Sequence, residues 1–527
     1  MPARVTIVST LLVVVSLAGL VSAQLPFHQA KIQSQVSIPP SLSQRINGIL
    51  SEPQVAKGFW GVEVEDLASG KALYEHDSEK LFVPASNTKL FTTASALGLI
   101  GPDFKFSTTV ETSGKLDRPG HVVADLILKG RGDPNLSGRS LPYRQKTERR
   151  FSPDKVLEEL TDQIVKNGVR YVEGDLIGDD SYYAFERFGE GWAQDDLLWD
   201  YGAPVSALSI NDNVIFLNIS PGKRSGDAAF ISLDPAVPYY QIENKVITTS
   251  TGAQNISINR EPGSKRLYLA GSIPLADNGY HASIAVEDPA EFAAIILRDL
   301  LRARGVVIRG IARARHADPG HVPSGGLLLA SPSSATPGIR LVLATHESQP
   351  LLEDIAVTDK VSQNLHAELL LRLLGAIKGR TADVAGGLEV VRGFVSLAGI
   401  TSEDLALYDG SGLSRRTLVS PHAVVKLLQY IVQQPWGASF QEALPVAGVD
   451  GSLSERLTEP AIRGRVRAKT GTLGHVNALS GYAQTASGRQ LVFSILSNNH
   501  NLTSKQATAV IDDVVRAIVD DKTYSLP

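Results

Sequence analysis

The sequence predicts an α+β protein in which one antiparallel sheet of five strands is interrupted by a large, mainly β insertion. Two strand-like segments near the N-terminus and three near the C-terminus flank a helical stretch, so a single sheet can collect all five. Residues 105–335 instead alternate short strands with glycine, proline and Asn-Asp turns. We therefore expect a discontinuous domain, 24–104 and 336–527, with residues 105–335 inserted as two nested domains.

The N-terminal part of this domain supplies two strands and a helix. Residues 58–66 and 72–75 alternate like strands and are joined by a Ser-Gly turn. Apolar residues then recur at helical spacing after Ser86, and Gly101-Pro102 ends the helix.

The remaining elements follow in order. In the insertion we expect strands at 122–129, 171–177, 214–219 and 256–259, with helices at 152–166 and 289–305. Amphipathic or buried helices are expected at 351–360, 365–377, 383–398 and 421–433. The last strands are expected at 465–472, 478–484 and 490–498, before a final helix at 504–519.

The first 23 residues have the pattern of a secretory signal peptide. Arg4 supplies a positive charge, residues 5–20 are apolar, and Val21-Ser22-Ala23 forms a small-residue cleavage site before Gln24. An uncleaved N-terminal anchor is the alternative. No cysteine follows the apolar run, which excludes a lipoprotein. We expect an exported protein of the periplasm or cell-wall space.

Composition restricts the chemistry further. The chain of 527 residues is 43% hydrophobic and 20% charged, as in folded globular proteins. It has no cysteine, which excludes disulfides, thiolate metal sites and cysteine nucleophiles. A net charge of −4 gives no reason to expect a nucleic-acid partner. Beyond the N-terminus no apolar run is long enough to span a bilayer, so any membrane contact is expected to be peripheral.

Ser86-Asn87-Thr88-Lys89 pairs a hydroxyl with an amine at a helix start. Positions i and i+3 share one helical face, so Lys89 can reach Ser86 and, if its pKa is lowered by burial, accept the hydroxyl proton. The spacing alone is weak evidence, because an N-cap explains it equally well. Two other segments share it, namely Ser152-Pro153-Asp154-Lys155, which we interpret as an N-cap, and Ser220-Pro221-Gly222-Lys223, which we interpret as a turn.

Two later motifs favour the catalytic interpretation of Ser86 over the N-cap. Ser362-Gln363-Asn364 lies between two expected helices, where an N-cap is again the alternative. Lys469-Thr470-Gly471 lies near the end of an expected strand, where the alternative is a solvated edge lysine before a turn. The ordered set SxxK, SxN and KTG is that of penicillin-binding proteins and class A β-lactamases.

With these motifs the chain resembles the serine acyl-transferase superfamily of penicillin-binding proteins. The long insertion, Gly132-Asp133-Pro134-Asn135-Leu136 and the stretch from Tyr408 to Arg415, YDGSGLSR, narrow the resemblance. The chain is similar to the D-Ala-D-Ala carboxypeptidase/endopeptidase family typified by penicillin-binding protein 4, the class C low-molecular-mass group. This resemblance implies a penicillin-binding/β-lactamase-like fold, with helices on both sides of the five-stranded antiparallel sheet.

The resemblance also implies a mechanism. Ser86 attacks the penultimate D-Ala carbonyl of a peptidoglycan stem peptide, Lys89 accepts its proton, and the N–H groups of Ser86 and Thr472 form the oxyanion hole. Ser362 and Lys469 relay the proton to the leaving amine, and Asn364 holds the acyl-side amide. Thr470, Gly471 and Thr472 form the strand that binds the terminal carboxylate. β-Lactams are expected to acylate Ser86, and no metal or organic cofactor is required.

A pocket for the substrate side chain is implied as well. Leu413 and Arg415 match family positions in that pocket, where the guanidinium suits a carboxylate. Asp179 or Asp180 is the candidate acid from the insertion, and the sequence does not choose between them. A surface ion pair for Arg415 and a solvated turn for the two aspartates are the alternatives.

Three other functions remain open at this stage. A serine β-lactamase shares the nucleophile, but no counterpart of its omega-loop glutamate is evident and the insertion argues against it. A catalytically silent peptidoglycan-binding protein is disfavoured by the intact motifs. An aminopeptidase or esterase on the same fold is opposed by Thr472 and the family-specific stretches.

Overall fold

The computed structural model describes residues 40–114, 116–144, 150–318, 324 and 341–521, and from Ser41 onward these form one compact unit. The expected signal peptide and its cleavage site lie outside the described residues. Within the described ranges, no helix is long and apolar enough to cross a membrane.

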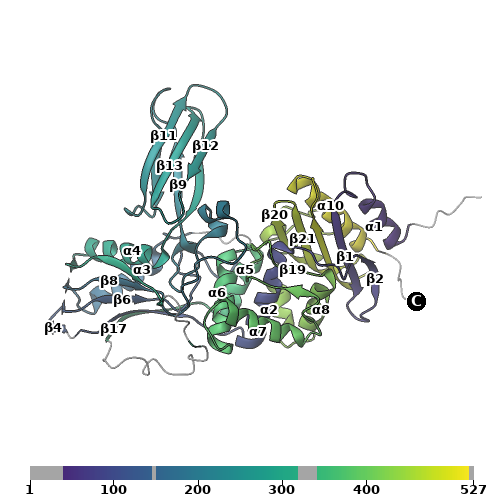
Figure 1. The fold of residues 1–527 in the computed structure, drawn as a ribbon, viewed down its shortest axis with the longest axis horizontal. Coiled ribbons are helices and arrows are strands. Elements are labelled where there is room, and N and C mark those ends of the chain that lie inside the picture. Colours follow the sequence, from purple (N-terminus) through teal and green to yellow (C-terminus); the bar gives the residue numbers. More distant parts are fainter. Residues whose placement is uncertain (1–39, 115, 145–149, 319–323, 325–340, 522–527) are drawn as a thin grey trace, which may run out of the picture. The chain divides into compact units, whose positions relative to one another are not determined.

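The predicted sheet of five strands is confirmed (Figure 1). Its strands are β1 (Phe59–Asp66), β2 (Ala72–His76), β20 (Val466–Leu473), β21 (Val476–Gln484) and β22 (Gln490–Asn498). They lie in the order β2-β1-β22-β21-β20, and every neighbouring pair is antiparallel. β20 is therefore an edge strand, and one of its sides is available to the substrate and to the serine motif.

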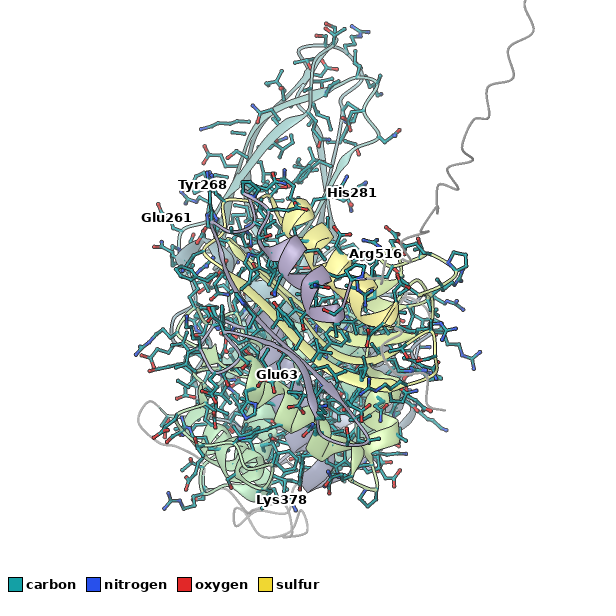
Figure 2. The ribbon with its side chains drawn as sticks, turned by 90° about the vertical axis from the view of Figure 1, so that its right-hand side faces the viewer. Glu63, Glu261, Tyr268, His281, Lys378 and Arg516 are labelled. Atoms are coloured by element: carbon teal, nitrogen blue, oxygen red, sulfur yellow. The ribbon has the colours of Figure 1, made fainter. Side chains whose placement is uncertain are left out.

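Helices cover both faces of this sheet. On one face α1 (Leu42–Leu50) and α10 (Ser504–Val519) lie side by side, as both views show (Figures 1 and 2), and pack on an apolar core with β1, β21 and β22. The other core collects α2 (Thr88–Ile100), α5 (Leu351–Lys360), α6 (Asn364–Lys378), α7 (Val384–Ser396), α8 (Pro421–Val432) and α9 (Gly437–Ala443). The helices expected at 351–360, 365–377, 383–398, 421–433 and 504–519 are thus present, whereas α9 was not predicted.

The inserted region contains several smaller sheets around its own core. One sheet has the order β16-β8-β6-β3-β17 and a second the order β15-β7-β5-β4, with α3 (Lys155–Lys166) and α4 (Pro289–Ala303) packed in the same core. The bounds are β3 (Ser107–Thr112), β4 (Leu116–Arg118), β5 (His121–Val122), β6 (Leu126–Lys129), β7 (Tyr171–Val172), β8 (Leu176–Asp179), β15 (Val307–Ile308), β16 (Ala312–Arg315) and β17 (Leu341–Glu347). Two three-stranded sheets comprise β9 (Val214–Ser220), β10 (Phe230–Asp234) and β14 (Tyr280–Ala285), and β11 (Gln241–Thr249), β12 (Asn255–Asn259) and β13 (Arg266–Pro274).

Two strands expected to be continuous are each divided between two sheets. The expected strand 122–129 breaks at Asp125 and the expected strand 171–177 breaks at Gly174. The cause is a local cross-link, because Asp125 Oδ1 accepts a hydrogen bond of 2.7 Å from the N–H of Asp175. A Cβ on Gly174 would lie 2.4 Å from the same oxygen, so the close approach requires glycine.

Two further differences concern boundaries. The prediction that Ser152 caps the helix at 152–166 is wrong, since the helix begins at Lys155 after Asp154. β17 pairs with β3, which associates residues 341–347 with the inserted sheet. This pairing favours a boundary after Glu347 rather than at 335, and the division into domains stays a prediction.

Candidate active site

Ser86 lies in a short 3-10 turn, η1 (Ala85–Asn87), that leads directly into α2. Ala85 has φ 48°, a value that residues with a side chain rarely adopt. Gly412 packs against this turn so closely that a Cβ on it would lie 1.9 Å from the Ala85 carbonyl oxygen. The strained turn is thus held by its surroundings, which fixes the position of the Ser86 side chain.

Lys89 is completely buried one turn after Ser86. Its Nζ lies 2.8 Å from Ser86 Oγ, 2.6 Å from Asn364 Oδ1 and 2.8 Å from the carbonyl oxygen of Ser411. Burial lowers the pKa of Lys89 well below its usual range, and the nearby Lys469 lowers it further. The expected contact between Ser86 and Lys89 is confirmed.

These contacts determine how a neutral Lys89 is oriented. Asn364 Oδ1 and the Ser411 carbonyl can only accept hydrogen bonds, so they take the two N–H bonds of a neutral amine. The lone pair then points to the third neighbour, the hydroxyl of Ser86. This is the arrangement that a general base needs before it removes the serine proton.

Asn364 connects this site to the inserted region. It is the first residue of α6, and its Nδ2 donates to the Tyr201 carbonyl over 2.8 Å. Because that carbonyl fixes which end of the amide carries the N–H, Oδ1 must face Lys89. The alternative of an N-cap role for Ser362 is wrong, since Gln363 caps α6.

The KTG motif contacts the SxN motif through Lys469. Its Nζ lies 2.8 Å from Ser362 Oγ and 3.0 Å from the Thr470 carbonyl oxygen. Lys469 is fully buried, which rules out the solvated edge lysine considered from the sequence. Burial lowers its pKa to about 8, opposed by the carboxylate of Asp359. Ser362 itself has φ 67°, a second strained residue at the site.

β20 approaches the serine turn at Gly471. A Cβ there would lie 2.8 Å from the Pro84 carbonyl oxygen and 3.1 Å from the Ser86 N atom. Thr470 Oγ1 lies 2.7 Å from Ser452 Oγ, and Thr472 is exposed on this edge strand. Glycine therefore brings the free edge of the sheet against the Ser86 backbone.

Comparison with known proteins identifies the family. The model of the D-Ala-D-Ala carboxypeptidase 3 (S13) family matches residues 42–518. The chain belongs to this S13 family. It is 34% identical over 472 residues to a D-alanyl-D-alanine carboxypeptidase of Actinomadura sp. strain R39, covering 87% of this chain and 81% of that one. It is 26% identical to the D-alanyl-D-alanine carboxypeptidase DacB of Haemophilus influenzae, covering 84% and 85% of the two chains.

Structural comparison agrees with the S13 assignment. The crystal structure of penicillin-binding protein 4 from Haemophilus influenzae superposes with a TM-score of 0.74 at 25% identity, covering 90% of this chain and 97% of that chain. The penicillin-binding fold predicted from the sequence is thereby confirmed, and this S13 protein is a serine-type D-Ala-D-Ala carboxypeptidase.

The residues predicted to form the pocket for the substrate side chain have contacts of two kinds in this S13 carboxypeptidase. Leu413 is buried, and Arg415 Nη1 donates to the Gly474 carbonyl over 3.2 Å, next to the β20–β21 turn. Asp179 binds the Ser181 hydroxyl and pairs with Arg315. Asp180 accepts from Ser206 Oγ at 2.8 Å and lies 2.8 Å from His316 Nδ1. Both acids are buried and paired within the insertion, so their pocket role stays a prediction that these contacts do not support.

Several site residues of the S13 carboxypeptidase were not found from the sequence. Glu368 accepts hydrogen bonds of 2.9 Å from the N–H groups of Gly410 and Ser411, which positions the Ser411 carbonyl beside Lys89. Asp359 is fully buried near Lys469. Both acids lie in helices whose other residues are mostly buried. A buried acid is unusual, so an acid in an otherwise apolar helix is the sequence feature that could have identified them.

Proposed function

We propose that this S13 carboxypeptidase hydrolyses the terminal D-Ala-D-Ala bond of peptidoglycan stem peptides through an acyl-enzyme on Ser86. The single observation that carries the proposal is the environment of Lys89. Its amine is buried and has a lowered pKa, and among its hydrogen-bond partners in the described residues the Ser86 hydroxyl is the one that can donate a proton.

In the acylation step Ser86 Oγ forms a bond to the penultimate D-Ala carbonyl carbon. The Ser86 proton passes to Lys89, and the N–H groups of Ser86 and Thr472 stabilise the oxyanion. When the C–N bond breaks, the proton held by Lys89 is relayed through Ser362 and Lys469, in contact over 2.8 Å, to the departing D-Ala amine, which leaves Lys89 neutral again. Water then cleaves the ester and regenerates the free serine.

The substrate carboxylate is proposed to bind at β20. Thr470 and Thr472 offer hydroxyls along the edge strand, and a protonated Lys469 supplies positive charge. Leu413 and Arg415 are proposed to contact the stem-peptide side chain. A cross-linked peptide as leaving group turns the same chemistry into endopeptidase cleavage, and the N-terminal pattern supports action after export to the periplasm.

β-Lactams carry a reactive amide and a carboxylate in the same relation as D-Ala-D-Ala. A structure of the Haemophilus influenzae penicillin-binding protein 4, 23% identical to this chain, is described as a complex with a novel β-lactam. We expect β-lactams to acylate Ser86 of this chain, with slow release.

The test combines labelling with product analysis. The protein is incubated with fluorescent penicillin and, separately, with a cross-linked muropeptide dimer whose products are identified by mass spectrometry. We expect stoichiometric labelling that Ser86→Ala abolishes, and loss of D-Ala or cleavage of the cross-link. Rapid turnover of nitrocefin would instead indicate a β-lactamase, and no labelling of the folded protein would indicate a silent binding protein.

A further inference from the structure

A second cluster of ionisable groups lies on the same sheet, away from the catalytic edge. Glu63 and Glu65 on β1 and His422 in the first turn of α8 place their potential ligand atoms within 4.8 Å of one another. Figure 2 labels Glu63 on the purple strand of the sheet. β22 and β21 separate β1 from β20, so the cluster takes no part in the mechanism above.

The sequence brings these ligands together by simple geometry. Residues i and i+2 of a strand point to the same face, so Glu63 and Glu65 both face α8, which packs on β1. His422 Nδ1 lies 2.9 Å from Glu63 Oε1. Gln429, two turns further along α8, donates to Glu65. The three ligands thus belong to two elements that are held in contact.

Two carboxyls of the cluster lie against each other. The Glu63 side chain is completely buried, no N–H or O–H group of the described residues donates to its Oε2, and its carboxyl contacts that of Glu65, so the pair needs either a shared proton or a cation. A buried carboxylate oxygen without a donor is costly. Negative charge also exceeds positive charge around Glu63. Glu75 lies opposite Glu63 on the neighbouring strand β2 and Glu79 lies near, and Lys426 supplies positive charge against them. The position therefore favours an added cation.

We propose that Glu63, Glu65 and His422 bind one Zn²⁺ ion. Carboxylate oxygens with an imidazole nitrogen suit zinc, whereas Mg²⁺ and Ca²⁺ select oxygen ligands. Ligands at about 2.0–2.2 Å from a tetrahedral zinc are separated by about 3.4 Å, so small side-chain movements close the present arrangement. The His422 side chain is 28% exposed, which gives the ion an entry path and leaves room for water as the fourth ligand.

Binding exchanges a proton for the metal and involves no redox step. Zn²⁺ replaces any proton shared between His422 Nδ1 and Glu63, and the proton goes to solvent. The ion then ties β1 to α8, so its effect is on stability rather than on the acylation of Ser86.

The test uses the full chain after removal of metal with a chelator. Zn²⁺ is titrated by calorimetry, and thermal unfolding is recorded with and without Zn²⁺. We expect one equivalent to bind and the melting temperature to rise. Glu63→Gln, Glu65→Gln and His422→Gln should each weaken binding at least about tenfold and remove the thermal shift.

A matched control is His281→Gln. His281 contacts an amide, Asn218 Oδ1, rather than a carboxylate, and this variant should bind Zn²⁺ as the wild type does. Fluorescent penicillin labelling shows that each variant is folded, independently of metal. If Glu63→Gln does not fold, the proposal is tested by His422→Gln, because the His422 side chain is partly exposed and its loss is better tolerated. Wild-type Zn²⁺ affinity in a labelled His422→Gln protein, or no binding by the wild type, overturns the proposal.

Discussion

Within the described residues, Lys89 Nζ has three hydrogen-bond partners, and among them Ser86 alone can give up a proton. Replacing Lys89 with methionine keeps the length of the side chain but removes the base. Because general-base catalysis typically contributes about 10²–10⁴-fold, we expect the rate of acylation by fluorescent penicillin to fall by that factor. Stopped-flow or gel-based labelling measures it, and Ser86→Ala sets the background. A Lys89→Met protein that labels at more than a tenth of the wild-type rate would show that another group takes the proton.

The two lysines predict the pH dependence of the reaction. Activity should fall on the acid side as Lys89 becomes protonated, and on the alkaline side as Lys469, with its pKa at about 8, loses its charge. Asp359 raises the pKa of both lysines. Asp359→Asn removes this negative charge. Because burial raises the pKa of Asp359 to about 7, the charge is present mainly on the alkaline side of the profile, so we expect the alkaline limb of kcat/KM to move to lower pH.

The control for this profile is Asp513→Asn. Asp513 is an exposed acid on α10 that pairs with Arg516, so its loss should leave both limbs of the profile unchanged. An identical alkaline limb in Asp359→Asn and wild type would mean that the buried carboxylate does not act on Lys469.

At the scale of elements, the contact between β20 and the serine turn depends on the absence of a side chain at Gly471. An alanine Cβ would lie 2.8 Å from the Pro84 carbonyl, so β20 must move away from Ser86. A misplacement of this kind can cost about 10²-fold in rate, and we expect Gly471→Ala to lose that much acylation.

The matched control is Gly393→Ala on α7, where a Cβ would meet nothing within 4 Å. It should label normally and unfold at the same or a slightly higher temperature, because alanine favours a helix by about 0.5–1 kcal/mol over glycine. Equal labelling by Gly471→Ala and Gly393→Ala would contradict the close approach.

Periodicity and motif spacing explain how much of the fold and of the active site could be predicted from the sequence. Strand-like segments at 58–66 and 490–498 and a helical segment at 504–519 were recognised as elements of the sheet domain, and three short motifs identified its five central side chains. Interruptions of a strand by a side-chain contact, as at Asp125, leave no periodic signal. Glu368 and Asp359 were missed because the contacts that join them to the site are made with backbone groups or lysines distant in sequence.

At the scale of the whole molecule, the insertion holds the start of α6 through buried charges. Arg139 and Asp212, both from the insertion, form a bidentate ion pair. His366 Nε2 lies 3.3 Å from Asp212, and its Nδ1 lies 2.7 Å from Asp354 on α5. His366 is two residues after Asn364, so this network and the Tyr201 carbonyl fix the same end of the helix.

Asp212→Asn tests this connection between the insertion and the catalytic site. Asp212 has φ 55°, which asparagine tolerates, so the change removes the charge without straining the backbone. Removing one partner of a buried ion pair costs about 3–5 kcal/mol, and we expect that loss in the free energy of unfolding in denaturant. The exposed pair Arg380–Glu389 provides the comparison, since Glu389→Gln should cost less than about 1 kcal/mol. A loosened α6 would also displace Asn364, so Asp212→Asn should acylate more slowly even where it remains folded. If Asp212→Asn loses the expected free energy of unfolding but is labelled by penicillin at the wild-type rate, the network stabilises the fold and does not position the catalytic residues.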